Sequence, residues 1–159
     1  MVKVSDFIGL EVLTVENGQE LGRVHQVVLD YEKAQLCGFI LSEATLFTFA
    51  RGILFEDIAN FGLDAITVST SCEVKDFSQL LEAPGIFLLE SFKNKELFSA
   101  CGQYLGIITD LLCNLSNGSI TYLELSDGLI YDFVYGRKTL PLPAFTAIHE
   151  DRLIVPEGS

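Results

Sequence analysis

The side chains that most often do chemistry are few in this sequence, and they do not cluster. The two histidines are His25 and His149. Neither has a Ser or Cys nearby in a nucleophile motif, so the signature of covalent catalysis is missing. His149 is followed by Glu150 and Asp151, an imidazole and two carboxylates that could serve as metal ligands. Because neighbouring side chains in a tight turn usually point apart, we expect a solvated turn here and no metal site.

The cysteines give no sign of a zinc or redox centre. Such centres need closely spaced ligand pairs, and no two cysteines here form a Cys-x-x-Cys pair or lie near a histidine. Two of them fall inside apolar, strand-like runs, where cysteine behaves as a small hydrophobic residue. We therefore expect reduced thiols in a cytoplasmic protein, at Cys37, Cys72, Cys101 and Cys113.

Two Gly-x-x-x-Gly patterns are the nearest approach to a phosphate-binding loop. They are Gly18–Gly22 and Gly102–Gly106. A phosphate loop needs a Lys and a Ser or Thr ahead of a helix. Here Arg23-Val24 and Ile107-Ile108 follow instead, in strand-like runs. We interpret all four residues as turn glycines.

The acidic residues of the second half show no catalytic pattern either. Catalytic carboxylate pairs must converge in a cleft, and nothing in the spacing of Asp110, Asp127 and Asp132 indicates convergence. We expect these side chains on the solvated surface. With no nucleophile, metal cluster or phosphate loop, the sequence predicts a protein that is not an enzyme and holds no metal or cofactor.

Composition limits the partners. The chain has 159 residues, 49% of them apolar, and a formal net charge of −12. Phosphate backbones and anionic lipid headgroups repel so acidic a chain, so direct nucleic-acid binding is not expected. The apolar run Leu36–Phe55 contains Glu43 and Arg51, which disfavour an integral membrane segment. The start also lacks the basic and apolar regions of a signal peptide, which favours the cytoplasm.

An internal repeat sets the organisation of the chain. Gly18–Gly22 matches Gly102–Gly106 at an offset of 84 residues, and Asp64–Val68 matches Asp151–Val155 at an offset of 87. The second copy therefore carries three extra residues before its last two strands. Two copies of one small domain fit the length.

Each copy has the pattern of a small all-β domain. In the first copy, Asn17-Gly18 is a strong hairpin signal, and a two-residue period places Cys37, Phe39 and Leu41 on one strand face. One helical turn is expected within residues 56–62. Five or six short strands with tight turns favour a small antiparallel β-barrel. The expected strands lie within residues 9–15, 21–29, 35–41, 53–55 and 65–68.

The fold class is therefore all-β, with two tandem small antiparallel β-barrels joined by a partly helical linker. We expect the first domain at 1–70, the linker at 71–92 and the second domain at 93–159. Within the linker, Lys75–Glu82 has helical spacing, and the segment Ala83-Pro84-Gly85 ends the helix. The apolar residues that follow indicate a buried strand or a docking segment.

The order of the repeated motifs has a counterpart in a known family. In the first copy the motifs are Ile8–Val12, Asn17–Val24, Gly38–Leu41 and Ile53–Val68; in the second they are Gly102–Gly106, Ile120–Gly128 and Leu140–Val155. This order resembles the PRC-barrel family, which includes the C-terminal domain of the ribosome-maturation factor RimM and the barrel of the photosynthetic reaction-centre H subunit. The chain departs from the pattern at Cys101 and Glu150, and we expect these departures to alter a turn but not the fold. The resemblance implies protein–protein association rather than catalysis.

Two loops between expected strands are more apolar than solvated connections need. They span residues 43–52 and 127–137. They either cap the barrels and seal the contact between the copies, or form an exposed patch for a partner. The candidate interface residues are Leu46, Phe47, Phe49, Leu129, Ile130, Phe133 and Tyr135.

The sequence therefore predicts a non-enzymatic adaptor or scaffold that binds another protein or a second copy of itself. The resemblance implies two alternatives. One is a ribosome-associated assembly factor acting through a basic ribosomal protein, as RimM would. The other is a peripheral component of a membrane electron-transfer complex. The negative charge suits a basic protein partner but not direct contact with rRNA.

Overall fold

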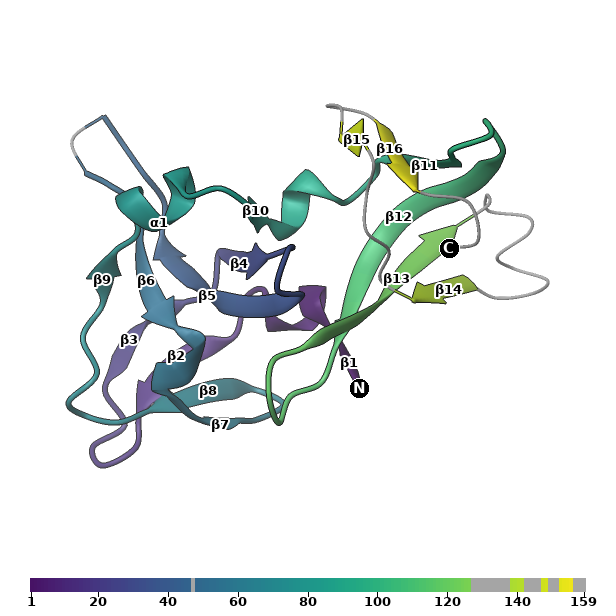
Figure 1. The fold of residues 1–159 in the computed structure, drawn as a ribbon. Helices are drawn as coiled ribbons and strands as arrows, with labels where there is room; N and C mark the ends of the chain where they lie inside the picture. The colour runs from purple at the N-terminus through teal and green to yellow at the C-terminus, as the bar shows by residue number, and fades with distance from the viewer. Residues whose placement is uncertain (47, 127–137, 142–146, 149–151, 156–159) are drawn as a thin grey trace.

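The computed structural model describes residues 1–46, 48–126, 138–141, 147–148 and 152–155 (Figure 1). Strands predominate among them, which confirms the all-β prediction. The described helical elements are one short α-helix, α1 (Ser78–Glu82), and the 3₁₀ helices Val4–Phe7, Phe55–Asp57 and Leu89–Ser91.

The first copy contributes β2 (Glu11–Thr14), β3 (Glu20–Arg23), β4 (Gln26–Asp30), β5 (Gln35–Ser42), β6 (Arg51–Leu54), β7 (Ile58–Phe61) and β8 (Ala65–Val68). One sheet has the order β3-β2-β8-β7. A second contains β4-β5-β6 and is extended at its two edges by β10 (Ile86–Leu88) and β9 (Lys75–Asp76). The helical turn expected at 56–62 is limited to its start, because β7 follows at once.

The second copy repeats this arrangement with β11 (Glu96–Ser99), β12 (Tyr104–Cys113), β13 (Ile120–Ser126), β14 (Lys138–Pro141), β15 (Ala147–Ile148) and β16 (Arg152–Val155). They form one sheet in the order β14-β13-β12-β11-β16-β15. The long strand β12 takes the place of β3 and β4. Strand order therefore recurs between the copies, as the repeat predicted.

Pairing is antiparallel throughout the described strands, with one exception in each copy. β2 runs parallel to β8, with Glu11 opposite Ala65. β11 runs parallel to β16, with Glu96 opposite Arg152. The same exception in both copies is independent evidence that they share one fold.

The first strand of each copy pairs with the other copy. β1 (Val2–Lys3) lies antiparallel to β12, with Val2 opposite Cys113. β10 lies antiparallel to β4, with Phe87 opposite Leu29. Cys113 and Leu29 are equivalent at the offset of 84 residues, so the two pairings are equivalent as well. We call residues 2–7 and 87–92 the exchanged segments.

Backbone geometry confirms that the exchanged segments correspond to each other. The chain leaves the first segment through Gly9, with φ of 88°, and the second through Asn94, with φ of 68°. The Gly9 amide donates to the Val24 carbonyl at 2.8 Å, and the Asn94 amide donates to the Ile108 carbonyl at 2.7 Å. Val24 and Ile108 are again equivalent positions.

The two copies meet around an approximate two-fold axis. Gln35 and Ser119, which are equivalent positions, form an antiparallel bridge with each other. The Leu36 amide donates to the Gly118 carbonyl at 2.9 Å, and the Ile120 amide donates to the Ala34 carbonyl at 2.8 Å. This is the reciprocal pattern of a contact between identical subunits in a dimer, built here within one chain.

One hydrophobic core extends through both copies. Buried side chains such as Phe39 of the first copy and Leu123 of the second belong to the same contiguous cluster. Phe7 meets Phe39 with ring centroids 5.2 Å apart. A separate small cluster contains Val28 and Phe77. Since burying a large apolar side chain stabilises a fold by about 1.5–3 kcal/mol, the shared core ties the stability of the copies together.

Segment 71–92 packs against the first copy. β9 pairs with β6, where Arg51 lies opposite Asp76. The Phe77 amide donates to the Ala50 carbonyl at 2.9 Å, and the Phe77 side chain is buried. The helix expected at Lys75–Glu82 is present as α1 over its second half.

A β-bulge alters the face prediction for β5. Val28 lies opposite Gly38, but the next residue of β4, Leu29, lies opposite Leu36, so Cys37 is an extra residue. An extra residue reverses the alternation of side chains beyond it. Phe39 and Leu41 therefore share the main core with Leu36, while Cys37 packs against the small cluster. The prediction that Cys37 shares their face was wrong.

Candidate interaction surfaces

The loop between β5 and β6 presents large apolar side chains to solvent. Leu46 is 96% exposed and Phe49 is 64% exposed. The loop is shaped by a tight turn in which the Thr45 amide donates to the Thr48 carbonyl at 2.9 Å, with the two hydroxyls 2.8 Å apart. Leu46 and Phe49 therefore do not cap a core. The remaining candidate interface residues lie outside the described residues, namely Phe47, Leu129, Ile130, Phe133 and Tyr135.

A groove of about 370 Å³ begins at the base of this loop. Its apolar wall includes Ile40, Ala50 and Leu88. Glu43 and Glu90 supply negative charge, and none of the lining residues is basic. The exposed loop and the groove thus form one continuous surface that combines apolar side chains with acidic ones. We call it the loop surface.

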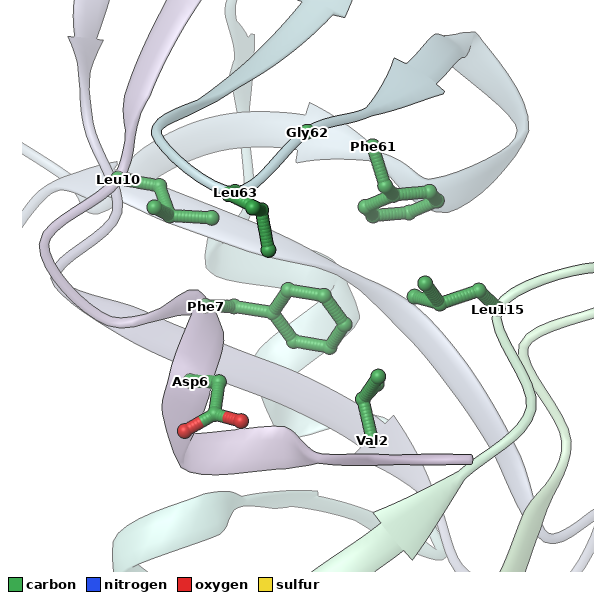
Figure 2. A pocket seen from close by; sticks show the side chains of 8 residues that line it. All are labelled: Val2, Asp6, Phe7, Leu10, Phe61, Gly62, Leu63 and Leu115. Atoms are coloured by element: carbon green, nitrogen blue, oxygen red, sulfur yellow. The ribbon is translucent and has the colours of Figure 1, made fainter.

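A second hollow, which we call the seam pocket, lies where the first copy meets the β12–β13 turn of the second (Figure 2). Its volume is about 290 Å³. Figure 2 shows its apolar side chains arranged around the ring of Phe7, with the carboxylate of Asp6 at one edge. The lining residues are Val2, Asp6, Phe7, Leu10, Phe61, Gly62, Leu63 and Leu115. A neighbouring hollow shares Phe61 and Leu115, so the depression continues past these two side chains.

The polar residues considered for chemistry lie apart. His25 is exposed where the chain passes between β3 and β4, and His149, Glu150 and Asp151 lie outside the described residues. In the part of the chain that the structure describes, no three His, Cys, Asp or Glu side chains are placed to hold a metal ion. Asp127 and Asp132 also fall outside that part.

Asp110 is not on the solvated surface, contrary to the sequence prediction. It is 4% exposed. Its Oδ1 accepts hydrogen bonds from the Ser5 amide at 3.1 Å and the Leu111 amide at 2.9 Å, and its carboxylate also accepts the Ser5 hydroxyl. Ser5 belongs to the first exchanged segment, whose docking was not visible in the sequence. Asp110 therefore anchors that segment instead of facing water.

A second acidic side chain holds the same segment. Lys3 Nζ lies 3.2 Å from Glu124 Oε2, and Glu124 is buried in β13. Glu124 Oε1 also accepts the Thr109 hydroxyl at 2.7 Å. These contacts join the N-terminal residues of the chain to the second copy.

The two Gly-x-x-x-Gly patterns are split between turns and strands. Gly18 and Gly102 lie in turns, as predicted, whereas Gly22 lies in β3 and Gly106 in β12. Gly22 has φ of +151°, and a Cβ there would lie 3.2 Å from the Leu41 Cβ. The prediction of a turn was wrong for these two, which lie in strands beside shifts of register and have positive φ angles.

All four cysteines are free thiols. Cys101 is exposed and Cys113 is buried, with Cys37 and Cys72 between these extremes. Burial raises the pKa of the Cys113 thiol to about 11. It also raises the pKa of Cys37. A raised pKa keeps these two as unreactive thiols at neutral pH.

No helix among the described residues is both long enough and apolar enough to cross a membrane.

Comparison with known proteins agrees with the repeat. The family model described as PRC-barrel domain matches the chain twice, at residues 1–71 and 84–159. The second match begins ahead of β10, so it includes the second exchanged segment. The chain is also 27% identical over 150 residues to the Bacillus subtilis (strain 168) protein YrrD, which is described as uncharacterized. The similarity covers 92% of this chain and 83% of YrrD.

Proposed function

Because this chain belongs to the PRC-barrel domain family and carries that domain twice, we propose that it is a non-enzymatic adaptor that binds another protein. The observation that supports this proposal is the loop surface. Leu46 and Phe49 are exposed at 96% and 64% on a loop held by its own hydrogen bonds. Large apolar side chains exposed together on a shaped loop are typical of a protein contact.

The charge of the chain indicates the kind of partner. Glu43 and Glu90 line the groove beside the loop, and the net charge is −12. Complementary potentials speed the encounter of two proteins and suppress wrong partners. A basic partner with apolar side chains fits this surface, and the same charge disfavours nucleic acid.

The loop surface can be tested by quantitative capture from an extract of the source cells, using the immobilised protein and mass spectrometry. The test variant is the double substitution Leu46→Ser and Phe49→Ser. A matched control, Val15→Ser, removes another apolar side chain that is 54% exposed in the first copy. Because the two test side chains are exposed, we expect the double variant to unfold at nearly the same urea concentration as the wild type.

We expect the double variant to lose a stoichiometric, basic protein that the wild type and Val15→Ser both retain. Raising the salt concentration should weaken the retained complex, because screening reduces attraction between opposite charges. Light scattering on the isolated protein separates a second copy of this chain from a different partner. Equal capture by all three proteins would contradict the assignment of the loop surface.

A further inference from the structure

We propose that the seam pocket receives an aromatic side chain of a partner protein, flanked in that partner by Lys or Arg. The pocket is separate from the loop surface. In Figure 1 the loop between β5 and β6 and the β12–β13 turn lie on different sides of the first copy. Binding at the seam pocket can therefore be tested separately from binding at the loop surface.

The approximate two-fold symmetry of the molecule shows what such a pocket accommodates. Phe7 and Phe92 are equivalent residues of the two exchanged segments. Across the seam, Phe92 is covered by Tyr31 of the first copy, with ring centroids 5.4 Å apart and planes 24° apart. Phe87 meets Phe92 edge-on at 5.4 Å. On this side of the seam, the space beside Phe92 is therefore filled by aromatic rings of the protein itself, Tyr31 from the first copy and Phe87 from the second exchanged segment.

At the seam pocket the same two positions hold smaller, aliphatic residues. Leu115 stands where the other side has Tyr31, and Val2 stands where it has Phe87. Both line the pocket together with Phe7. These smaller side chains leave room beside Phe7, in a pocket of about 290 Å³. An engineered apolar cavity of about 150 Å³ takes up benzene, so an aromatic side chain fits.

The rim of the pocket is accessible and negatively charged. Leu63, which lines the pocket, is 97% exposed. Asp6 lines the pocket at one edge, and none of the lining residues is basic. An aromatic residue that is followed or preceded by Lys or Arg satisfies both features, because the ring fills the apolar space while the cation lies near Asp6.

The chain offers a convenient way to measure this binding, because it has no tryptophan. The probes are three capped tripeptides, Lys-Trp-Lys, Gln-Trp-Gln and Glu-Trp-Glu, whose tryptophan fluorescence is followed during titration with the whole protein. Burial of the indole shifts its emission to shorter wavelength. Backbone amide shifts of Phe61, Leu63 and Leu115 in NMR spectra locate the bound peptide.

Two variants fill the pocket with the rings that the other half carries, Leu115→Tyr and Val2→Phe. Val15→Tyr is the control, because it adds a ring at an exposed position of the first copy that does not line the pocket. The melting temperature of each variant shows that it folds. Asp6→Asn removes the charge at the edge without changing the size of the side chain.

We expect saturable binding of Lys-Trp-Lys to the wild type, to Val15→Tyr and to the Leu46→Ser, Phe49→Ser double variant. Leu115→Tyr and Val2→Phe should lose it. Glu-Trp-Glu should bind at least about fivefold more weakly, and Asp6→Asn should weaken Lys-Trp-Lys by roughly two- to fivefold, as for exposed charge pairs. Equal binding to a folded, ring-filled variant would overturn the proposal, since it would show charge attraction elsewhere. Equal binding of the acidic and basic peptides would overturn the requirement for a basic partner.

Discussion

The two exchanged segments dock with the same backbone pairing but with different side-chain chemistry. In the first, Ser5 donates its amide and hydroxyl to the buried carboxylate of Asp110. In the second, the ring of Phe92 is held between Tyr31 and Phe87. Docking therefore depends on main-chain hydrogen bonds and on one buried Phe in each segment. The remaining contacts differ, so one copy can close the seam with rings while the other leaves a pocket.

The strongest test of this comparison separates the copies. We expect residues 1–83 and 84–159, produced as independent chains, to be unfolded or self-associated, because each loses the strand that the other supplies. Domains of this size bury only about 60% of their unfolded surface and are marginal even when complete. Mixing the two chains should restore a single cooperative urea transition, followed by circular dichroism. A folded, monomeric half would show that the exchange is dispensable.

A buried ring of the second exchanged segment should give the next largest effect. Phe92 is 1% exposed, so Phe92→Ala should lower the free energy of unfolding by about 3–5 kcal/mol. The equivalent substitution Phe7→Ala should cost a similar amount, in one transition for the whole chain. Tyr104→Ala, at an exposed ring, is the control. A variant that unfolds in two separate steps would contradict the shared core.

The polar anchor of the first segment should give a moderate effect that its counterpart does not share. Asp110→Ala leaves the partly buried amide of Ser5 without its acceptor and should cost about 1.5–3 kcal/mol in urea denaturation. The equivalent residue is Gln26, whose Nε2 donates to Glu90 at 3.1 Å on the surface. Gln26→Ala should change stability by less than about 0.5 kcal/mol. Equal losses at the two positions would remove the contrast between the anchors.

The smallest expected effect on stability comes from the thiol of Cys113. Cys113 lies opposite Val2 in β1, and the equivalent residue of the first copy is Leu29. The folded-state pKa of Cys113 is raised to about 11 by burial, above its ordinary value near 9. The native protein therefore keeps its proton while the unfolded chain loses it. Stability should fall as pH rises through this window, and it should be unaffected by this group below it. Urea midpoints between pH 8 and 11, compared with Cys113→Ala, measure the contribution, and identical slopes would refute it.

Thiol reactivity measures how often the first exchanged segment detaches from the second copy. Cys101 is exposed and should react with a thiol reagent at once, whereas Cys113 should react only when β1 leaves β12. Destabilising the anchor with Asp110→Ala should speed the labelling of Cys113 and leave that of Cys101 unchanged.

Local signals in the sequence predicted most of the strands and their succession along the chain, but not their order within the sheets. The hairpin signal at Asn17-Gly18 lies between β2 and β3, and the third run lies within β5. Such features depend on residues near one another in the chain, so they are visible without the fold. β7 was not predicted, because Ile58–Phe61 has no alternation of buried and exposed residues. The face of Cys37 was wrong because a bulge depends on the register with the partner strand.

The candidate sites were predicted less completely. Leu46 and Phe49 are found by a simple rule, because a loop with several large apolar residues is unusual. The seam pocket had no such signal, since its walls come from residues as far apart as Val2, Phe61 and Leu115. An alignment of the copies places Leu115 against Tyr31 and shows that an aromatic ring is replaced by an aliphatic side chain. This difference indicates a pocket only once the structure shows that the β4–β5 and β12–β13 turns each contact the opposite copy.

The sequence by itself determined the repeat, the all-β class and the succession of most strands along the chain, because alternation and turn residues act locally. Only the tertiary structure decided that β1 and β10 each join the opposite copy. Main-chain donors and acceptors are alike along every strand, so the residues of an edge strand do not by themselves determine which sheet that strand extends. The choice depends on how Phe7 and Phe92 pack at the seam, and that packing exists only when both copies are folded together.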